Sequence, residues 1–161
     1  MKTKDTYRQP GHLIRRAHQM ATAVFMQEAK AFDLTPVQFS ALVEIREHPG
    51  TDATRVSDLI YFDRSTIGNV LDRLEKKGLI WRESGVEDRR TKRLFLTPQG
   101  RAVLRKIAVK LPRISDAILA PLSAADRSRL VKLLGALVDP DGGSGGKSSR
   151  TKLPKSPSPI L

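Results

Sequence analysis

The sequence of 161 residues contains no cysteine. Disulfide bonds, thiolate metal sites and thiol-based redox sensing are therefore excluded. The chain also lacks any uninterrupted apolar run near the ~20 residues that a helix needs to cross a bilayer. The polar residues 1–5 do not form the apolar region of a signal peptide. These absences predict a cytoplasmic protein that does not enter a membrane.

Groups that carry catalysis are also scarce. The three histidines His12, His18 and His48 are widely separated, and no tight carboxylate cluster completes a metal-ligand set around them. There is no serine–histidine–aspartate order, phosphate-binding glycine loop or zinc-protease motif. We therefore expect no metal, no cofactor and no enzymatic activity.

Acidic residues are too few to balance the basic ones. The chain has 29 lysines and arginines against 17 acidic residues, which gives a formal net charge of +12. Such an excess favours a polyanionic partner, either nucleic acid or an anionic membrane surface. Charge alone does not decide between the two.

One stretch indicates which polyanion is bound. Residues 64–77 carry apolar side chains at i, i+3, i+4 and i+7, namely Ile67, Val70, Leu71 and Leu74. This spacing predicts a helix with one buried face, begun by Asp63 as N-cap and ended at Gly78. The other face presents side chains that suit base edges and phosphates. They are Arg64, Ser65, Thr66, Asn69, Asp72, Arg73 and Lys76.

Two interpretations of this face are open: an ordinary solvated surface, or the recognition helix of a helix-turn-helix. A short helix from about Asp52 precedes it across the turn 61–63, which favours the second interpretation. Arg55 and Ser57 of that short helix are candidates for contacts with the phosphate backbone. The tight connection is the one expected between the two helices of such a motif.

A β-hairpin is predicted after the recognition helix. Residues 79–84 and 92–97 are rich in β-branched and aromatic side chains and flank a polar loop. Its tip holds Arg89 and Arg90, with Lys92 at its edge. Such a basic arm suits the negative potential of a DNA minor groove, although a charged tip is also typical of an ordinary soluble turn.

Helices are expected on both sides of this unit. They cover residues 11–32, 36–47 with the capping pair Thr35 and Gln38, and 98 onward with Thr97 as the cap and a kink at Pro112. Ser123 and Asp126 form a second capping pair, which predicts a last helix that runs to about residue 138. From residue 139 the composition changes to glycine, serine, proline and lysine, which predicts a disordered basic tail that either adds phosphate affinity or serves only solubility.

The order of these motifs resembles the MarR family of winged helix-turn-helix regulators from about residue 11 to residue 138. The motifs that carry the resemblance are Asp63-Arg64-Ser65-Thr66, Leu71-Asp72-Arg73-Leu74-Glu75-Lys76-Lys77-Gly78-Leu79-Ile80, Asp88-Arg89-Arg90 and Leu96-Thr97-Pro98-Gln99-Gly100. The resemblance implies a mainly α fold with a small β-wing. A flexible N-terminus (1–10), a winged DNA-binding domain (35–97), a helical dimerisation region (11–34 and 98–138) and the tail (139–161) would make up the chain.

The terminal helices hold more apolar surface than a small winged domain covers. We expect it to be buried against a second copy in a homodimer, as the resemblance implies. The alternative is an ordinary core within a single chain.

Arg16 adjoins the apolar stripe of the first helix, where an unpaired charge is costly. A salt bridge to Glu28 or Glu44, or a side chain reaching water, would explain it. The resemblance favours an anionic ligand instead, since the first helix of MarR-type regulators lines a pocket. It implies an aromatic acid or coenzyme A thioester, with these candidates: Arg15, Arg16, His18, Met20, Phe25, Phe39 and Arg46.

The sequence thus predicts a homodimeric repressor that leaves a double-stranded DNA operator when a small anionic aromatic effector binds. Two alternatives are an architectural protein that coats DNA without a ligand and an acyl-thioester binding protein on a winged scaffold.

Overall fold

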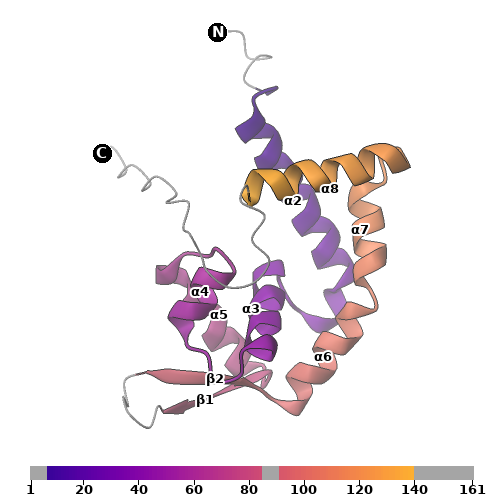
Figure 1. The fold of residues 1–161 in the computed structure, drawn as a ribbon. Coiled ribbons are helices and arrows are strands. Elements are labelled where there is room, and N and C mark those ends of the chain that lie inside the picture. The colour runs from indigo at the N-terminus through magenta and orange to yellow at the C-terminus, as the bar shows by residue number, and fades with distance from the viewer. Residues whose placement is uncertain (1–6, 85–90, 140–161) are drawn as a thin grey trace. The chain divides into compact units, whose positions relative to one another are not determined.

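Helices dominate the described residues, and the strands form one antiparallel pair (Figure 1). The computed structural model describes residues 7–84 and 91–139. The elements in chain order are α2 (Pro10–Glu28), the 3-10 helix η1 (Lys30–Phe32), α3 (Pro36–Glu47), α4 (Ala53–Leu59), α5 (Arg64–Lys76), β1 (Ile80–Ser84), β2 (Lys92–Leu96), α6 (Pro98–Ala108), α7 (Leu111–Leu119) and α8 (Ala124–Val138). The predicted mainly α fold with a small β-wing is confirmed.

The chain separates into two units, Met1–Ala120 and Pro121–Leu161. The first unit holds the core together with every element from α2 to α7. The second contributes α8, which is capped by Ser123 through a hydrogen bond from the Asp126 backbone N–H to its hydroxyl (3.2 Å). That predicted cap is confirmed.

Local capping signals in the sequence fix most helix starts. The Thr35 hydroxyl accepts from the Gln38 backbone N–H (3.3 Å), while the Gln38 side chain accepts from the Thr35 N–H (3.1 Å). This reciprocal pair satisfies two N–H groups at the start of α3, which have no partner within the helix. The Thr97 hydroxyl accepts from the Gly100 N–H (3.0 Å) at the start of α6 in the same way. Both predicted starts are confirmed.

Three predicted helix ends need correction. The first helix stops at Glu28 and continues only as η1, because the chain tightens to i→i+3 bonding before Asp33 turns left-handed (φ 49°). Pro112 separates α6 from α7 instead of kinking one helix. A proline ring clashes with the carbonyl four residues earlier, and that residue, Ala108, ends α6. The recognition helix ends at Lys76, one residue before the predicted end.

Gly78 adopts φ +67° immediately after α5. The Leu79 N–H then donates to the Leu74 carbonyl (3.0 Å), and the Gly78 N–H donates to the Glu75 carbonyl (2.8 Å). These bonds satisfy carbonyls that the helix end leaves open, and the left-handed conformation is one that glycine adopts without steric cost. The chain therefore leaves α5 directly into β1.

The core of the first unit lies under α5 and the sheet. Ile67, Leu71 and Leu74 of α5 are buried as predicted, and they pack with residues of α3, α4 and β1. The other large side chains that are fully buried include Leu34, Leu42, Ile45, Val56, Ile80, Leu94, Leu104 and Ile107. The recognition helix thus rests on a continuous apolar core.

The sheet pairs Ile80 with Leu96 and Ser84 with Lys92 at its two ends. A third segment joins it: the Leu94 N–H donates to the Thr51 carbonyl (2.8 Å), and the Gly50 N–H donates to the Leu94 carbonyl (2.9 Å). No local sequence pattern predicts this bridge, because it joins residues that are far apart along the chain. It anchors the wing to the end of α3.

Candidate DNA-binding interface

Helices α4 and α5 form the predicted helix-turn-helix. The Phe62 N–H donates to the Ser57 carbonyl (2.9 Å) across the turn, and Tyr61 within it is left-handed (φ 51°). Ser57 itself is buried and donates to the Thr54 carbonyl (2.9 Å). The expectation that Ser57 meets phosphate is therefore wrong, whereas Arg55 on the same helix is exposed.

Three of the predicted DNA-binding residues lie on the exposed face of α5 without partners. Asn69, Arg73 and Lys76 are exposed, and within the described part of the chain no side chain forms a hydrogen bond or ion pair with theirs. Their spacing places them on one helical face. Amide, guanidinium and ammonium groups are thus available together at a protein surface.

The first turn of α5 is arranged differently. The Arg64 guanidinium holds Asp58 of α4 at 2.8 Å with Nη2 contacting both carboxylate oxygens. The hydroxyls of Ser65 and Thr66 donate to the Asp63 carboxylate instead of lying free. These two hydroxyl donors, Ser65 first, lower the pKa of Asp63 below its usual value. Asp63 is thus the N-cap by position, but its carboxylate binds side chains.

Arg82 of β1 is a residue that sequence reasoning missed. Its Nη2 lies 2.7 Å from Asp72 Oδ1, and its Nη1 lies 3.4 Å from Glu75 Oε2. Asp72 therefore faces the wing and not the open face of α5. The sequence did hold a signal for this contact: the predicted helix carries two acids at i and i+3, and the next strand carries a basic residue. The arginine ties the angle of the wing to the recognition helix.

The wing itself is described only up to its tip. Lys92 donates to the Ser84 hydroxyl (2.8 Å) across the two strands. Arg89 and Arg90, the predicted minor-groove residues, lie outside the described residues. The strand ends therefore carry one of the three predicted basic side chains.

The ligand candidates lie in three places. Phe25 and Phe39 meet between α2 and α3 with ring centroids 5.6 Å apart, and Phe25 is buried. The others on α2 are exposed: Arg15, which donates to Gln19 (3.3 Å), together with Arg16, His18 and Met20. Arg46 lies at the other end of α3, where it pairs with Glu47 (2.7 Å).

The acids proposed as salt-bridge partners of Arg16 are engaged elsewhere. Glu28 lies 3.3 Å from Arg113 Nε, and Glu44 lies 3.7 Å from His48 Nε2. No carboxylate among residues 7–84 and 91–139 pairs with Arg16. Its cation is therefore exposed to solvent and available to an anion.

Large apolar side chains are exposed at both ends of the described chain. On α2 they are Leu13, Ile14, Met20 and Met26, and on α8 they are Val131, Leu133, Leu134, Leu137 and Val138. Helix α8 has no buried residue. Single exposed apolar residues are ordinary, but several on one helix indicate an interaction surface.

Comparison with known proteins identifies this arrangement. The model of the MarR family matches residues 34–92. The HTH-type transcriptional repressor NicR of Pseudomonas putida is 31% identical over 141 residues, which cover 88% of this chain and 89% of NicR. The chain belongs to the MarR family. The predicted family is therefore confirmed, and the protein is a MarR-type transcriptional regulator.

Two solved structures extend the likeness of this MarR protein over most of its length. PcaV of Streptomyces coelicolor, in complex with its natural ligand, is 31% identical with a TM-score of 0.75, covering 86% of this chain and 98% of PcaV. BpsR of Bordetella bronchiseptica, whose DNA binding is regulated by 6-hydroxynicotinic acid, is 31% identical with a TM-score of 0.74, covering 83% of this chain and 95% of BpsR. Both are regulators with the same winged fold.

Two further observations on the described residues bear on function. None of their helices is both long and apolar enough to span a membrane. Nor does that part of the chain gather three histidine or acidic side chains in a way that could hold a metal ion. The relatives are transcriptional regulators and not enzymes.

Proposed function

We propose that this MarR-type regulator is a homodimeric repressor of a pseudo-palindromic operator, released by a small anionic aromatic ligand. The observation that carries the DNA-binding part is the polar face of α5 formed by Asn69, Arg73 and Lys76, whose side chains have no partner among the described residues; Arg55 of α4 is exposed as well. Asparagine and arginine are the side chains that pair bidentately with adenine and guanine in a major groove. The first-turn residues Arg64, Ser65 and Thr66 would contact nearby phosphates.

The wing would extend this contact into the flanking minor groove. Lys92 is the first residue of β2, and Arg89 and Arg90 match the family motif Asp88-Arg89-Arg90. Two copies would place their recognition helices ~34 Å or ~10 bp apart on one face of the duplex. The dimer would be built from residues 11–34 and 98–138, whose exposed apolar side chains on α2 and α8 call for a partner surface.

The effector part rests on Arg16 and on the relatives. Arg16 is a cation without a described partner at the head of α2, and Arg15 and His18 lie within one turn of it. Met20, Phe25 and Phe39 would supply apolar contacts for a ring, whereas Arg46, a candidate from the sequence, lies at the other end of α3 with Glu47 and is left out of this site. A natural ligand is bound in PcaV, and 6-hydroxynicotinic acid regulates DNA binding by BpsR. An aromatic acid or its coenzyme A thioester has the required chemistry.

The test is a fluorescence anisotropy titration of DNA from upstream of its own gene and of random DNA at one salt concentration. Arg73→Ala should weaken binding to the operator by about 1–3 kcal/mol and leave random DNA less affected. Arg8→Ala, an exposed arginine ahead of α2 and outside both the DNA-binding and the dimerisation regions, is the matched control. Equal affinity of the unaltered protein for both DNAs would favour the architectural alternative and refute the proposal.

The effector is tested by repeating the titration with aromatic acids and aromatic acyl-CoA thioesters. A ligand that binds the DNA-free conformation more tightly than the DNA-competent one must lower operator affinity. Arg16→Gln should retain operator binding and lose the response. Ligand binding without any operator would instead support the acyl-thioester binding alternative.

A further inference from the structure

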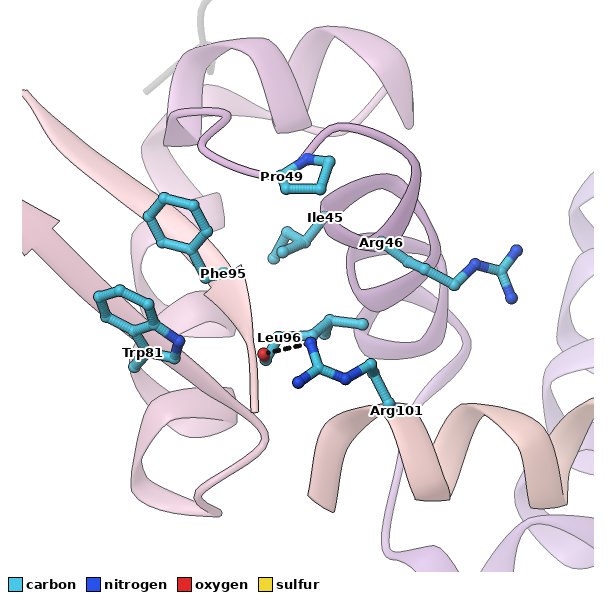
Figure 2. A pocket seen from close by; sticks show the side chains of 7 residues that line it. All are labelled: Ile45, Arg46, Pro49, Trp81, Phe95, Leu96 and Arg101. Carbon is cyan, nitrogen blue, oxygen red and sulfur yellow. Dashed lines mark hydrogen bonds between the residues drawn. The ribbon is translucent and has the colours of Figure 1, made fainter. Parts of the chain in front are cut away.

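We propose that a second site, a hollow beside the wing, binds a planar aromatic carboxylate. The hollow has a volume of about 250 Å³ and lies wholly within the first unit, between the end of α3, the two strands and the first turn of α6 (Figure 2). It is lined by Ile45, Arg46, Pro49, Trp81, Phe95, Leu96 and Arg101. Apart from Arg46, none of these belongs to the effector candidates on α2 and α3.

One wall of the hollow is aromatic. Trp81 and Phe95 are direct cross-strand partners, and their rings stack with centroids 4.5 Å apart and planes inclined by 18°. Trp81 remains 44% exposed despite its size. Pro49 and the buried Ile45 form the apolar side of the hollow at the end of α3, beside the rings (Figure 2). An aromatic ring placed against this pair gains area burial together with an offset-stacked or edge-to-face contact, the two arrangements that aromatic pairs prefer.

The facing wall is cationic. Arg101 Nη1 donates to the Leu96 carbonyl (3.0 Å), which fixes the guanidinium at the edge of the hollow (Figure 2). The remaining guanidinium donors stay available, because no described carboxylate pairs with Arg101. None of the seven lining residues is acidic. A guanidinium held in place loses little freedom on binding a carboxylate, for which its fork geometry is suited.

Arg46 has a smaller part. Its stem lines the hollow, but its guanidinium points away from the aromatic pair and is held by Glu47 (2.7 Å) (Figure 2). The ligand anion is therefore assigned to Arg101. A volume of about 250 Å³ falls below the roughly 300–1,000 Å³ of drug-sized pockets, which suits an acid with a single ring.

Trp81 is the only tryptophan of the chain, so its fluorescence reports on this hollow directly. The experiment titrates the full-length protein, without DNA, with benzoate. Cyclohexanecarboxylate keeps the charge but lacks the flat ring, and benzamide keeps the ring but lacks the charge. We expect a saturable change with benzoate and a much weaker one with both controls. This comparison needs no variant and is independent of any folding defect.

Variants then locate the site. Arg101→Gln should weaken benzoate affinity about tenfold, the loss expected when a charge-assisted contact is removed. Arg105→Gln, one turn further along α6 and not lining the hollow, should retain it. Benzoate and cyclohexanecarboxylate giving equal signals, or an unaltered affinity in Arg101→Gln, would overturn the proposal.

The outcome is separable from the proposed effector site. Arg16→Gln should leave the benzoate signal of Trp81 intact, because Arg16 does not line the hollow. If Arg16→Gln abolishes that signal and Arg101→Gln does not, the ligand binds at α2. That result would overturn the second site while supporting the first.

Discussion

Gly100→Ala is a severe test of how the wing is joined to α6. A Cβ at this position would lie 2.1 Å from the Leu79 carbonyl oxygen and 3.0 Å from its carbon. Both atoms belong to backbone that is held in place, since the Leu79 carbonyl accepts from the Thr97 N–H (3.1 Å) and the Thr97 hydroxyl donates to the Gly78 carbonyl (2.6 Å). The methyl group cannot be accommodated by a side-chain rotation.

The expected magnitude combines two opposing effects. Forcing backbone apart at an overpacked position costs about 3 kcal/mol, the upper part of the usual range. Alanine in a helix is favoured over glycine by about 1 kcal/mol, which offsets part of this cost. Gly100→Ala should therefore lower the free energy of unfolding by about 2 kcal/mol. A Cβ at Gly68 in α5 would meet nothing within 4 Å. Gly68→Ala should therefore raise the free energy of unfolding by up to about 1 kcal/mol.

The assay is urea unfolding followed by far-ultraviolet circular dichroism, with all three proteins at one concentration. A fixed concentration is needed because stability depends on protein concentration if unfolding is coupled to dissociation of the proposed dimer. Relative to the unaltered protein, Gly100→Ala should be less stable and Gly68→Ala more stable. The free energies of unfolding of the two variants should therefore differ by about 3 kcal/mol. A Gly100→Ala protein as stable as Gly68→Ala would show that the α6 junction yields, and would refute the close-approach argument.

Three further predictions concern the interface. Tyr61 is left-handed (φ 51°) and 83% exposed, so Tyr61→Asn should raise the free energy of unfolding by about 1 kcal/mol in urea titrations; a decrease would contradict this. Asp58→Asn frees Arg64, so anisotropy should show tighter DNA binding with a salt slope steeper by about one phosphate contact; an unchanged slope would argue against an Arg64 contact. Replacing Arg82 and Asp72 by alanine singly and together should reveal a coupling of about 0.5–1 kcal/mol in the free energy of unfolding. Additive losses would show that the ion pair does not contribute to stability.

The sequence predicted those parts of the fold that depend on neighbouring residues. The caps at Thr35, Thr97 and Ser123 and the glycine end of α5 use partners within a few residues, and all four appear in the structure. The separation of α6 from α7 was equally local. The carbonyl with which the Pro112 ring clashes lies four residues earlier, at Ala108. The sequence could therefore have predicted a break in the helix, whereas only a kink was predicted.

Contacts between distant segments were not accessible in this way. The bridge from Thr51 to Leu94 depends on the path of the chain through three intervening elements. The aromatic pair of Trp81 and Phe95 follows from the hairpin register, but Arg101 joins it only because α6 starts beside the sheet. Spacing along one helix identifies a face, whereas it does not identify what another element brings to that face.

The same limit applies within the candidate DNA-binding face and leads to a division of roles. Arg64 is already held by an acid, so DNA that docks there would have to replace an ion pair of 2.8 Å. Asn69 and Arg73 have no described partner, so DNA would only have to order them, at about 0.5–1.5 kcal/mol for each side chain. Exchanging the Asp58 carboxylate for a DNA phosphate discriminates little between DNA sequences, because every nucleotide carries the same phosphate. Ordering a free side chain against the correct base edge does discriminate between sequences. If DNA binds as proposed, sequence specificity should therefore reside in Asn69 and Arg73, and substitutions of Arg64 should change affinity for all sequences alike.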